Sequence, residues 1–212
     1  MGTFQKKVGI MGGTFNPVHN GHLLLAEHAR EELALDEIWF MPSGTSYMKP
    51  QDEILSSAKR LFMVKLAVKE NPFFKVCDME TKKEGNTYTW ETLETLRKEY
   101  PSCDFTFLMG ADSLFQIENW KKPERIFASC KVAAAVRDGM DFEACERQAV
   151  RLGELFGADI RVLHAPRVDI SSTDVRKRCQ TGKSIRYLVP DALREWIEQE
   201  KIYGALPETE NG

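Results

Sequence analysis

The sequence has few cysteines, and they are not arranged to build a stabilising framework. The five cysteines, an odd number, are scattered through 212 residues, and none forms a Cys-x-x-Cys pair. A disulfide scaffold and a structural zinc site are therefore both disfavoured. We expect free thiols in a reducing compartment.

Long apolar runs are also absent. The first apolar segment, 8–11, is too short for the core of a signal peptide, and no later run approaches the length of a membrane span. We therefore expect a cytoplasmic protein with no membrane partner.

An excess of positive charge is likewise missing. The chain has 29 Lys and Arg against 32 Asp and Glu, for a formal net charge of −3. Nucleic acid is therefore not an expected partner, although a local basic site can still hold a small polyanion. No linker divides the chain, so we expect a single domain over 1–212, with 207–212 frayed. The sequence leaves open whether the chain forms a homo-oligomer.

Short strands and helices are predicted to alternate along the whole chain. Strands are expected at 7–11, 37–41, 73–76, 104–109, 131–136 and 159–163. Helices are expected at 21–33, 56–70, 89–99, 142–156, 172–179 and 190–200. This alternation predicts an α/β fold with a doubly wound parallel sheet, whose ligands bind beyond the carboxyl ends of the strands.

A glycine-rich segment follows the first predicted strand. It begins Gly12-Gly13-Thr14-Phe15 and ends His19-Asn20-Gly21-His22 at the start of a helix. Glycines let backbone N–H groups approach a phosphate, and the positive end of the helix points into the same crevice. His19 and His22, three residues apart, can face one bound anion. Gly21 leaves room for a nucleotide to lie against the helix. Neither a Walker A loop nor Gly-x-Gly-x-x-Gly fits this spacing.

The segment 13–22 resembles the His-x-Gly-His motif of the nucleotidylyltransferase superfamily, and the resemblance runs from Val8 to about Tyr203. It implies a Rossmann-like fold of the nucleotidylyltransferase type. It also implies that His19 and His22 contact the phosphates of ATP and stabilise charge at the α-phosphorus.

A second candidate phosphate site lies near the end of the sequence, in the run Ile170-Ser171-Ser172-Thr173-Asp174-Val175-Arg176. Hydroxyl groups at a helix start can simply cap the helix. Together with free N–H groups and Arg176, they can also form an anion cradle. The run resembles the Ile-Ser-Ser-Thr-x-x-Arg motif of the same superfamily, which implies that it holds the β- and γ-phosphates of ATP.

The middle of the sequence resembles the nicotinate mononucleotide adenylyltransferases. The resemblance rests on Gly110-Ala111-Asp112, on Trp120-Lys121, and on the stretch from Thr87 to Leu93. It implies that Gly110 and Asp112 belong to the ATP site, with Asp112 at a strand end taking ribose hydroxyls. It also implies that Trp120 stacks on the pyridine ring and that Thr87 and Thr89 flank its carboxylate. Tyr88 and Trp90 are interpreted as core aromatics.

One segment departs from the family pattern. Where the family often has Pro-Pro-His-Lys, this chain reads Ser46-Tyr47-Met48-Lys49. Lys49 keeps the phosphate-binding cation of that motif.

The resemblance implies AMP transfer from ATP to nicotinate mononucleotide, with His19, His22, Lys49 and Arg176 as the catalytic set. No acidic cluster predicts metal ligands from the protein, so Mg²⁺ is expected to arrive with ATP. The alternatives are an enzyme for nicotinamide mononucleotide, aminoacyl-adenylate chemistry, which the short length disfavours, and a non-catalytic nucleotide sensor on the same fold.

Overall fold

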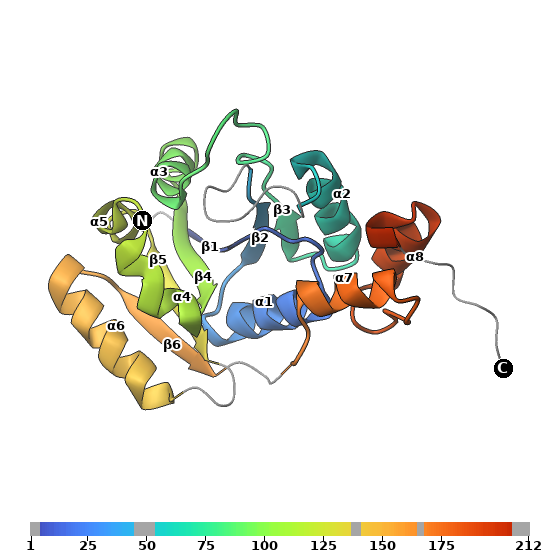
Figure 1. Cartoon of the computed structure of the whole chain (residues 1–212). Helices are drawn as coiled ribbons and strands as arrows, with labels where there is room; N and C mark the ends of the chain where they lie inside the picture. The colour runs from blue at the N-terminus through green and yellow to red at the C-terminus, as the bar shows by residue number, and fades with distance from the viewer. Residues whose placement is uncertain (1–4, 45–53, 137–140, 165–167, 205–212) are drawn as a thin grey trace.

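The predicted parallel sheet is the centre of the molecule. The computed structural model describes residues 5–44, 54–136, 141–164 and 168–204. Within them the six strands are β1 (Lys6–Gly13), β2 (Glu37–Pro42), β3 (Phe74–Val76), β4 (Cys103–Gly110), β5 (Lys131–Val136) and β6 (Ile160–His164). Every neighbouring pair is parallel, and the strand order is β3-β2-β1-β4-β5-β6 (Figure 1). The fold class is confirmed.

The helices occupy the predicted stretches and several further ones. They are α1 (Asn20–Glu32), α2 (Ser57–Val68), α3 (Thr89–Glu99), α4 (Ala111–Gln116), α5 (Pro123–Phe127), α6 (Phe142–Phe156), α7 (Ser172–Gln180) and α8 (Asp191–Gln199), with 3₁₀ turns η1 (Ile117–Asn119) and η2 (Ile202–Gly204). The sequence prediction missed α4, α5 and both 3₁₀ turns, because elements this short show no clear helical period.

Each face of the sheet has its own hydrophobic core. One core holds Met11 of β1 and buried residues of α1, α2, α7 and α8. The other holds Val8 and Ile10 of β1 and buried residues of α3, α4, α5 and α6. Residues alternate between the two cores along β1 because successive strand side chains point to opposite faces. The sheet is therefore covered on both sides, as a doubly wound fold requires.

Small side chains make the most deeply buried contacts of helix α1. Ala26 and Ala29 are its buried residues. Leu25 and Leu33 are partly buried against the same core, whereas Leu24 is 49% exposed. Small side chains allow the helix to approach the sheet, which keeps its first turn beside the end of β1.

After β6 the chain crosses back to the opposite half of the molecule. Figure 1 shows α7 and α8 on the side of α2, far from α6, which precedes them in sequence. Contacts between α2 and α8 and between α7 and η2 hold this group together. The start of α7 is thereby brought to the loop that follows β1. No helix in the described ranges is long and apolar enough to cross a membrane.

Candidate active site

The two histidines of the glycine-rich segment lie against each other at the start of α1. His19 caps the helix and is 3% exposed, and its ring stacks on that of His22 with centroids 3.7 Å apart. The backbone N–H of His19 donates to Nδ1 of His22 over 3.2 Å. Since Nδ1 accepts this bond, the proton of a neutral His22 ring is on Nε2. His22 therefore presents a fixed N–H donor at the positive end of the helix.

Phe15 shapes the backbone that leads to these histidines. Its φ of +50° lies in the left-handed region, which is uncommon for a bulky residue. Its ring is 2% exposed and meets the edge of the His22 ring at 5.1 Å. A Cβ on Gly13 would lie 3.0 Å from the Phe15 ring, so the glycine makes room for it. Thr14 sits between them, at the turn of the loop.

Gly21 makes room for the ring of His19. A Cβ at this position would lie 3.1 Å from Nδ1 of His19. The imidazole of His19 therefore lies next to the space that the missing side chain leaves. Gly21 acts by allowing His19 to fold back over the first helical turn.

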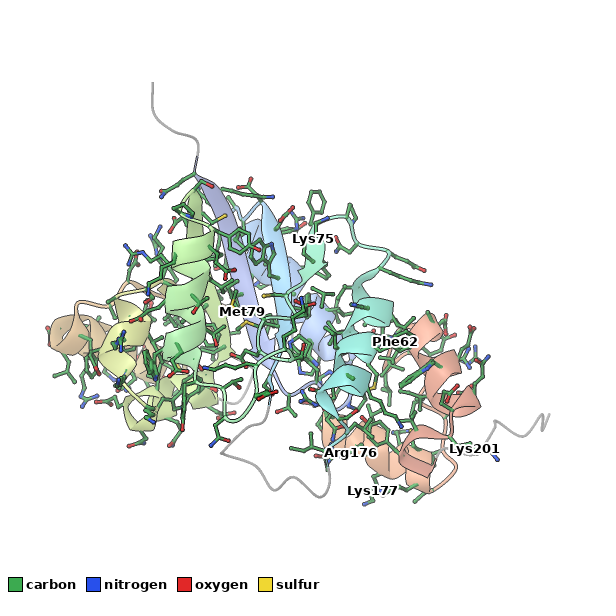
Figure 2. The ribbon with its side chains drawn as sticks, turned by 90° about the horizontal axis from the view of Figure 1, so that it is seen from above. Phe62, Lys75, Met79, Arg176, Lys177 and Lys201 are labelled. Carbon is green, nitrogen blue, oxygen red and sulfur yellow. The ribbon has the colours of Figure 1, made fainter. Side chains whose placement is uncertain are left out.

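The second predicted phosphate motif meets the first. The hydroxyl of Ser172 donates to the Pro17 carbonyl over 2.8 Å, and Nη1 of Arg176 donates to the Asn16 carbonyl over 3.0 Å. Nη2 of Arg176 reaches the hydroxyl of Thr173. In Figure 2 Arg176 lies near the start of α2, whereas Lys177 lies at the outer rim of α7. Two motifs about 155 residues apart in sequence thus form one structure.

The serine run caps a helix, which is the simpler of its two interpretations, and its role as an anion cradle stays a prediction. Ser171 is the N-cap of α7, and its hydroxyl accepts the backbone N–H of Asp174 over 3.1 Å. Ile170, just before it, is half-buried against the core. The N-termini of α1 and α7 converge on the same loop, so both helix dipoles favour an anion there.

Beyond β4 the structure leaves open space. A Cβ on Gly110 would meet no described atom within 4 Å, whereas one on Gly12 would approach the ring of Phe107 to 3.1 Å. Asp112 was expected at a strand end, but it lies in the first turn of α4, which begins directly after β4. Its carboxylate is exposed on the carboxyl edge of the sheet. Strands β1 and β4 are neighbours, and the strand order reverses between them. In open parallel sheets, ligands bind at this position, beyond the carboxyl ends of the strands.

The three residues predicted to hold the acceptor differ in burial and in their contacts. Trp120 is half-buried, and its ring meets Phe107 edge-on at 6.3 Å. Thr89 is the first residue of α3. Thr87 is 6% exposed, and its hydroxyl donates to the buried carboxylate of Glu80. The Thr87 hydroxyl is therefore engaged with a buried carboxylate in the protein interior.

Three cations lie on the two aromatic rings of this region. The Lys121 ammonium lies 4.1 Å from the centre of the Tyr88 ring, and Lys122 and Arg125 lie 4.2 and 4.1 Å from that of Trp90. Trp90 is 9% exposed and belongs to the core, as predicted, while Tyr88 is half-buried. These contacts fix the segment after Trp120 against the start of α3 and make its surroundings positive.

Sequence reasoning missed several buried polar residues near these loops. Arg60 and Glu80 are 2% and 7% exposed, and Asn16 is 5% exposed. The Asn16 side-chain oxygen accepts the hydroxyl of Tyr203 over 2.8 Å and the N–H of Leu55 over 3.3 Å. One signal was available: Arg60 shares a helical stripe with Met63, Val64 and Val68 and so falls on the apolar face of α2.

One predicted catalytic residue and the predicted frayed tail, 207–212, lie outside the described residues. Lys49 belongs to the segment 45–53, for which the structure gives no description. Among the described side chains, no three His, Cys, Asp or Glu residues gather into a group that could hold a metal ion.

Comparison with known proteins identifies the family of this chain. The family model described as cytidylyltransferase-like matches residues 10–178, which include both phosphate motifs. A probable nicotinate-nucleotide adenylyltransferase of Lachnoclostridium phytofermentans is 44% identical over 94% of this chain and 100% of its own length. The chain belongs to this adenylyltransferase family. A second relative, from Exiguobacterium sibiricum, has the same description and is 40% identical over 93% of this chain and 98% of its own.

Solved structures of the family share the fold at low identity. The Plasmodium falciparum nicotinic acid mononucleotide adenylyltransferase complexed with NaAD is 19% identical, with a TM-score of 0.77. The alignment covers 95% of this chain and 98% of that one. The two proteins therefore share the arrangement of strands and helices.

Proposed function

We propose that the protein transfers the AMP moiety of ATP to nicotinate mononucleotide, giving nicotinate adenine dinucleotide and pyrophosphate in NAD biosynthesis. The observation that carries the proposal is the meeting of two phosphate motifs. Arg176 and Ser172 bind the carbonyls of Asn16 and Pro17, beside the stacked histidines at the start of α1. Two relatives that match 94% and 93% of the chain are described as probable nicotinate-nucleotide adenylyltransferases.

The reaction needs positioning and charge neutralisation more than proton transfer. The 5′-phosphate of the acceptor is already ionised, so its oxygen can attack the α-phosphorus of ATP without a general base. Nε2 of His22 and the ring of His19 would face the charge that grows at that phosphorus. The start of α7, with Thr173 and Arg176, would hold the leaving pyrophosphate. Lys49 remains a proposed phosphate cation, as in the family motif.

A divalent ion, which we propose to be Mg²⁺, would enter with the nucleotide. The described residues offer no cluster of three metal-ligating side chains. This arrangement suits an ion held by phosphate oxygens and water, because Mg²⁺ usually keeps several waters in phosphate sites. Its contribution would be to neutralise charge on the bridging phosphates.

Selectivity for the acid would come from the region around Trp120 and α3. The pyridine ring would stack on Trp120, and the backbone and hydroxyl donors at the start of α3, including Thr89, would face its carboxylate. Lys121 and Lys122 make this region positive. We also propose that the chain is a single domain and works in the cytoplasm on these small molecules.

The test is a comparison of the two mononucleotides with ATP and Mg²⁺, monitored by release of pyrophosphate. We expect kcat/KM for the acid to exceed that for the amide by about 100-fold, since an amide loses charge-assisted hydrogen bonds. Equal efficiency on both would remove the acid assignment and keep the reaction class. Binding of ATP without pyrophosphate release on either acceptor would support the non-catalytic alternative.

A further inference from the structure

A buried guanidinium joins the two loops that carry the candidate site. Arg60, in the first turns of α2, donates to the carbonyls of Thr14 over 2.7 Å, Ser43 over 2.6 Å and Gly44 over 3.0 Å. Its Nε donates to Leu55 over 3.0 Å. Thr14 belongs to the glycine-rich loop after β1, and Ser43 and Gly44 follow β2. One side chain thus fixes the ends of two adjacent strands.

Among the residues that the structure describes, Arg60 forms no ion pair. All the hydrogen bonds that it donates among the described residues go to backbone carbonyl oxygens. Burial lowers its pKa, and Glu80 and Tyr203 act on it only through their fields. A buried charge is costly, and an apolar side chain of similar size would fill the same volume on α2. An apolar residue could not, however, donate the hydrogen bonds that Arg60 makes to the two loops.

A buried carboxylate holds the same segment from the other side. Glu80 accepts the backbone N–H of Gly44 and the hydroxyls of Thr87 and Thr92. A Cβ on Gly44 would lie 2.4 Å from the Glu80 carbonyl oxygen and 2.8 Å from Cγ2 of Thr87. Arg60 therefore binds the carbonyls of the segment Ser43–Gly44, and Glu80 binds the N–H of Gly44. Glu80 also connects this segment to Thr87, at the start of the proposed acceptor side.

We propose that Arg60 is a positioning residue that sets the distance between the ATP loop at Thr14 and the acceptor side at Gly44 and Thr87. The inference rests on the proposed function, because it assigns those two loops to the two substrates. Transfer between two polyanions depends on in-line placement of the reacting groups, so a shift of either loop would slow the reaction without removing any group that touches substrate.

The experiment compares Arg60→Met and Arg60→Lys with Arg194→Met. Arg194 is also buried, at 9% exposure, but it pairs with Asp191 and Glu198 of its own helix α8. The kinetic constants, the thermal midpoint and the affinity for a non-hydrolysable ATP analogue are measured for each variant well below its midpoint.

We expect Arg60→Met to lower kcat by about 10- to 100-fold and to raise the acceptor KM, as a small misplacement does. Arg60→Lys should recover part of the loss, because an ammonium can still donate to more than one carbonyl. Arg194→Met should lower the thermal midpoint and leave both constants unchanged. If Arg60→Met behaved like Arg194→Met, the residue would be structural only and the proposal overturned.

The affinity measurement separates this inference from the proposed function. If the wild-type protein lacked activity on nicotinate mononucleotide, the proposed function would fail. The role of Arg60 at the glycine-rich loop would still be tested by the ATP analogue, whose affinity we expect to fall in Arg60→Met and to be kept in Arg194→Met. Equal affinity in the two variants would overturn it. Should Arg60→Met not fold, Arg60→Lys alone carries the comparison, and unchanged constants in that variant would count against the proposal.

Discussion

At the scale of single residues, a backbone hydrogen bond and a ring stack fix the orientation of His22. Nδ1 of His22 is committed to the N–H of His19, which leaves Nε2 as a donor of fixed direction. Stacking of the two rings at 3.7 Å restricts rotation of both. Such donors cost little reorganisation when charge develops in the transition state.

Removing either ring should therefore affect turnover more than binding. We expect His22→Ala and His19→Ala each to lower kcat by about 10²–10³, as loss of one preorganised donor does. The Kd for ATP should change much less, since the charge that these rings meet grows during transfer. His28→Ala, further along α1, is the control and should keep normal turnover. Near-normal kcat in either loop variant would make that histidine structural.

Trp120 offers a second test at this scale. Its ring is half-buried and makes an edge-on contact with Phe107, and the loss of that contact should cost about 0.5–1.5 kcal/mol of stability beyond the effect of the area that the ring buries. If the other face stacks on the pyridine ring, Trp120→Ala should raise the KM for the mononucleotide by about 10–100-fold and leave that for ATP nearly unchanged. Michaelis constants and thermal unfolding are measured together. A loss of about 3–5 kcal/mol with an unchanged acceptor KM would identify a core residue instead.

At the scale of elements, the long strands and helices could be predicted because their patterns repeat over several turns or pairs of residues. The helix at 142–156 and the strand at 131–136 were predicted with the bounds that the structure has. Helix α4 was missed because it continues β4 without a loop, and α5 because it has only five residues.

The candidate site was predictable only where a local motif carried it. The segments 12–22 and 170–176 have compositions that indicate an anion site, and they do meet. The hydrogen bonds of Thr87 and of the segment Ser43–Gly44 are made with Glu80 and Arg60, which lie elsewhere in the sequence. No local pattern encodes which distant carboxylate a threonine will face. The roles of the predicted residues toward substrate stay predictions.

The carboxylate of Glu80 predicts a pH effect on the segment that it holds. Burial raises its pKa above the usual 4.5, although three hydrogen bonds favour the charged form. A carboxyl with a raised pKa contributes full stability below its unfolded pKa and loses that contribution as pH rises through the folded value. The stability of the wild type relative to Glu80→Gln should therefore increase as pH falls from about 8 to about 5. Thermal midpoints across this range measure it.

The exposed neighbour Glu84 supplies the matched variant for this measurement. Glu84→Gln, in the same segment, should follow the wild type across the whole range. A constant difference between wild type and Glu80→Gln would mean that the buried carboxyl does not titrate in this window.

At the scale of the whole molecule, all five cysteines are free and are distributed over both cores and their margins. Burial raises the pKa of each thiol, to about 12 for Cys130 and about 11 for Cys179. Thiols in such surroundings are structural rather than reactive, because the thiolate is the nucleophile.

We accordingly expect slow modification of the native protein by a thiol-specific reagent at about pH 8. Counting of labelled thiols should give all five only after unfolding in denaturant. Rapid labelling of Cys130 or Cys179 in the native state would show that the region around it opens locally.

The contact between Ser172 and the Pro17 carbonyl spans 155 positions of the chain. During synthesis the glycine-rich loop leaves the ribosome early, whereas α7 emerges only after every strand of the sheet has been made. A product of interrupted translation that ends before residue 170 contains all six strands but only one of the two proposed phosphate motifs. Completing the sheet and completing the proposed nucleotide site are thus separate events in the synthesis of the chain.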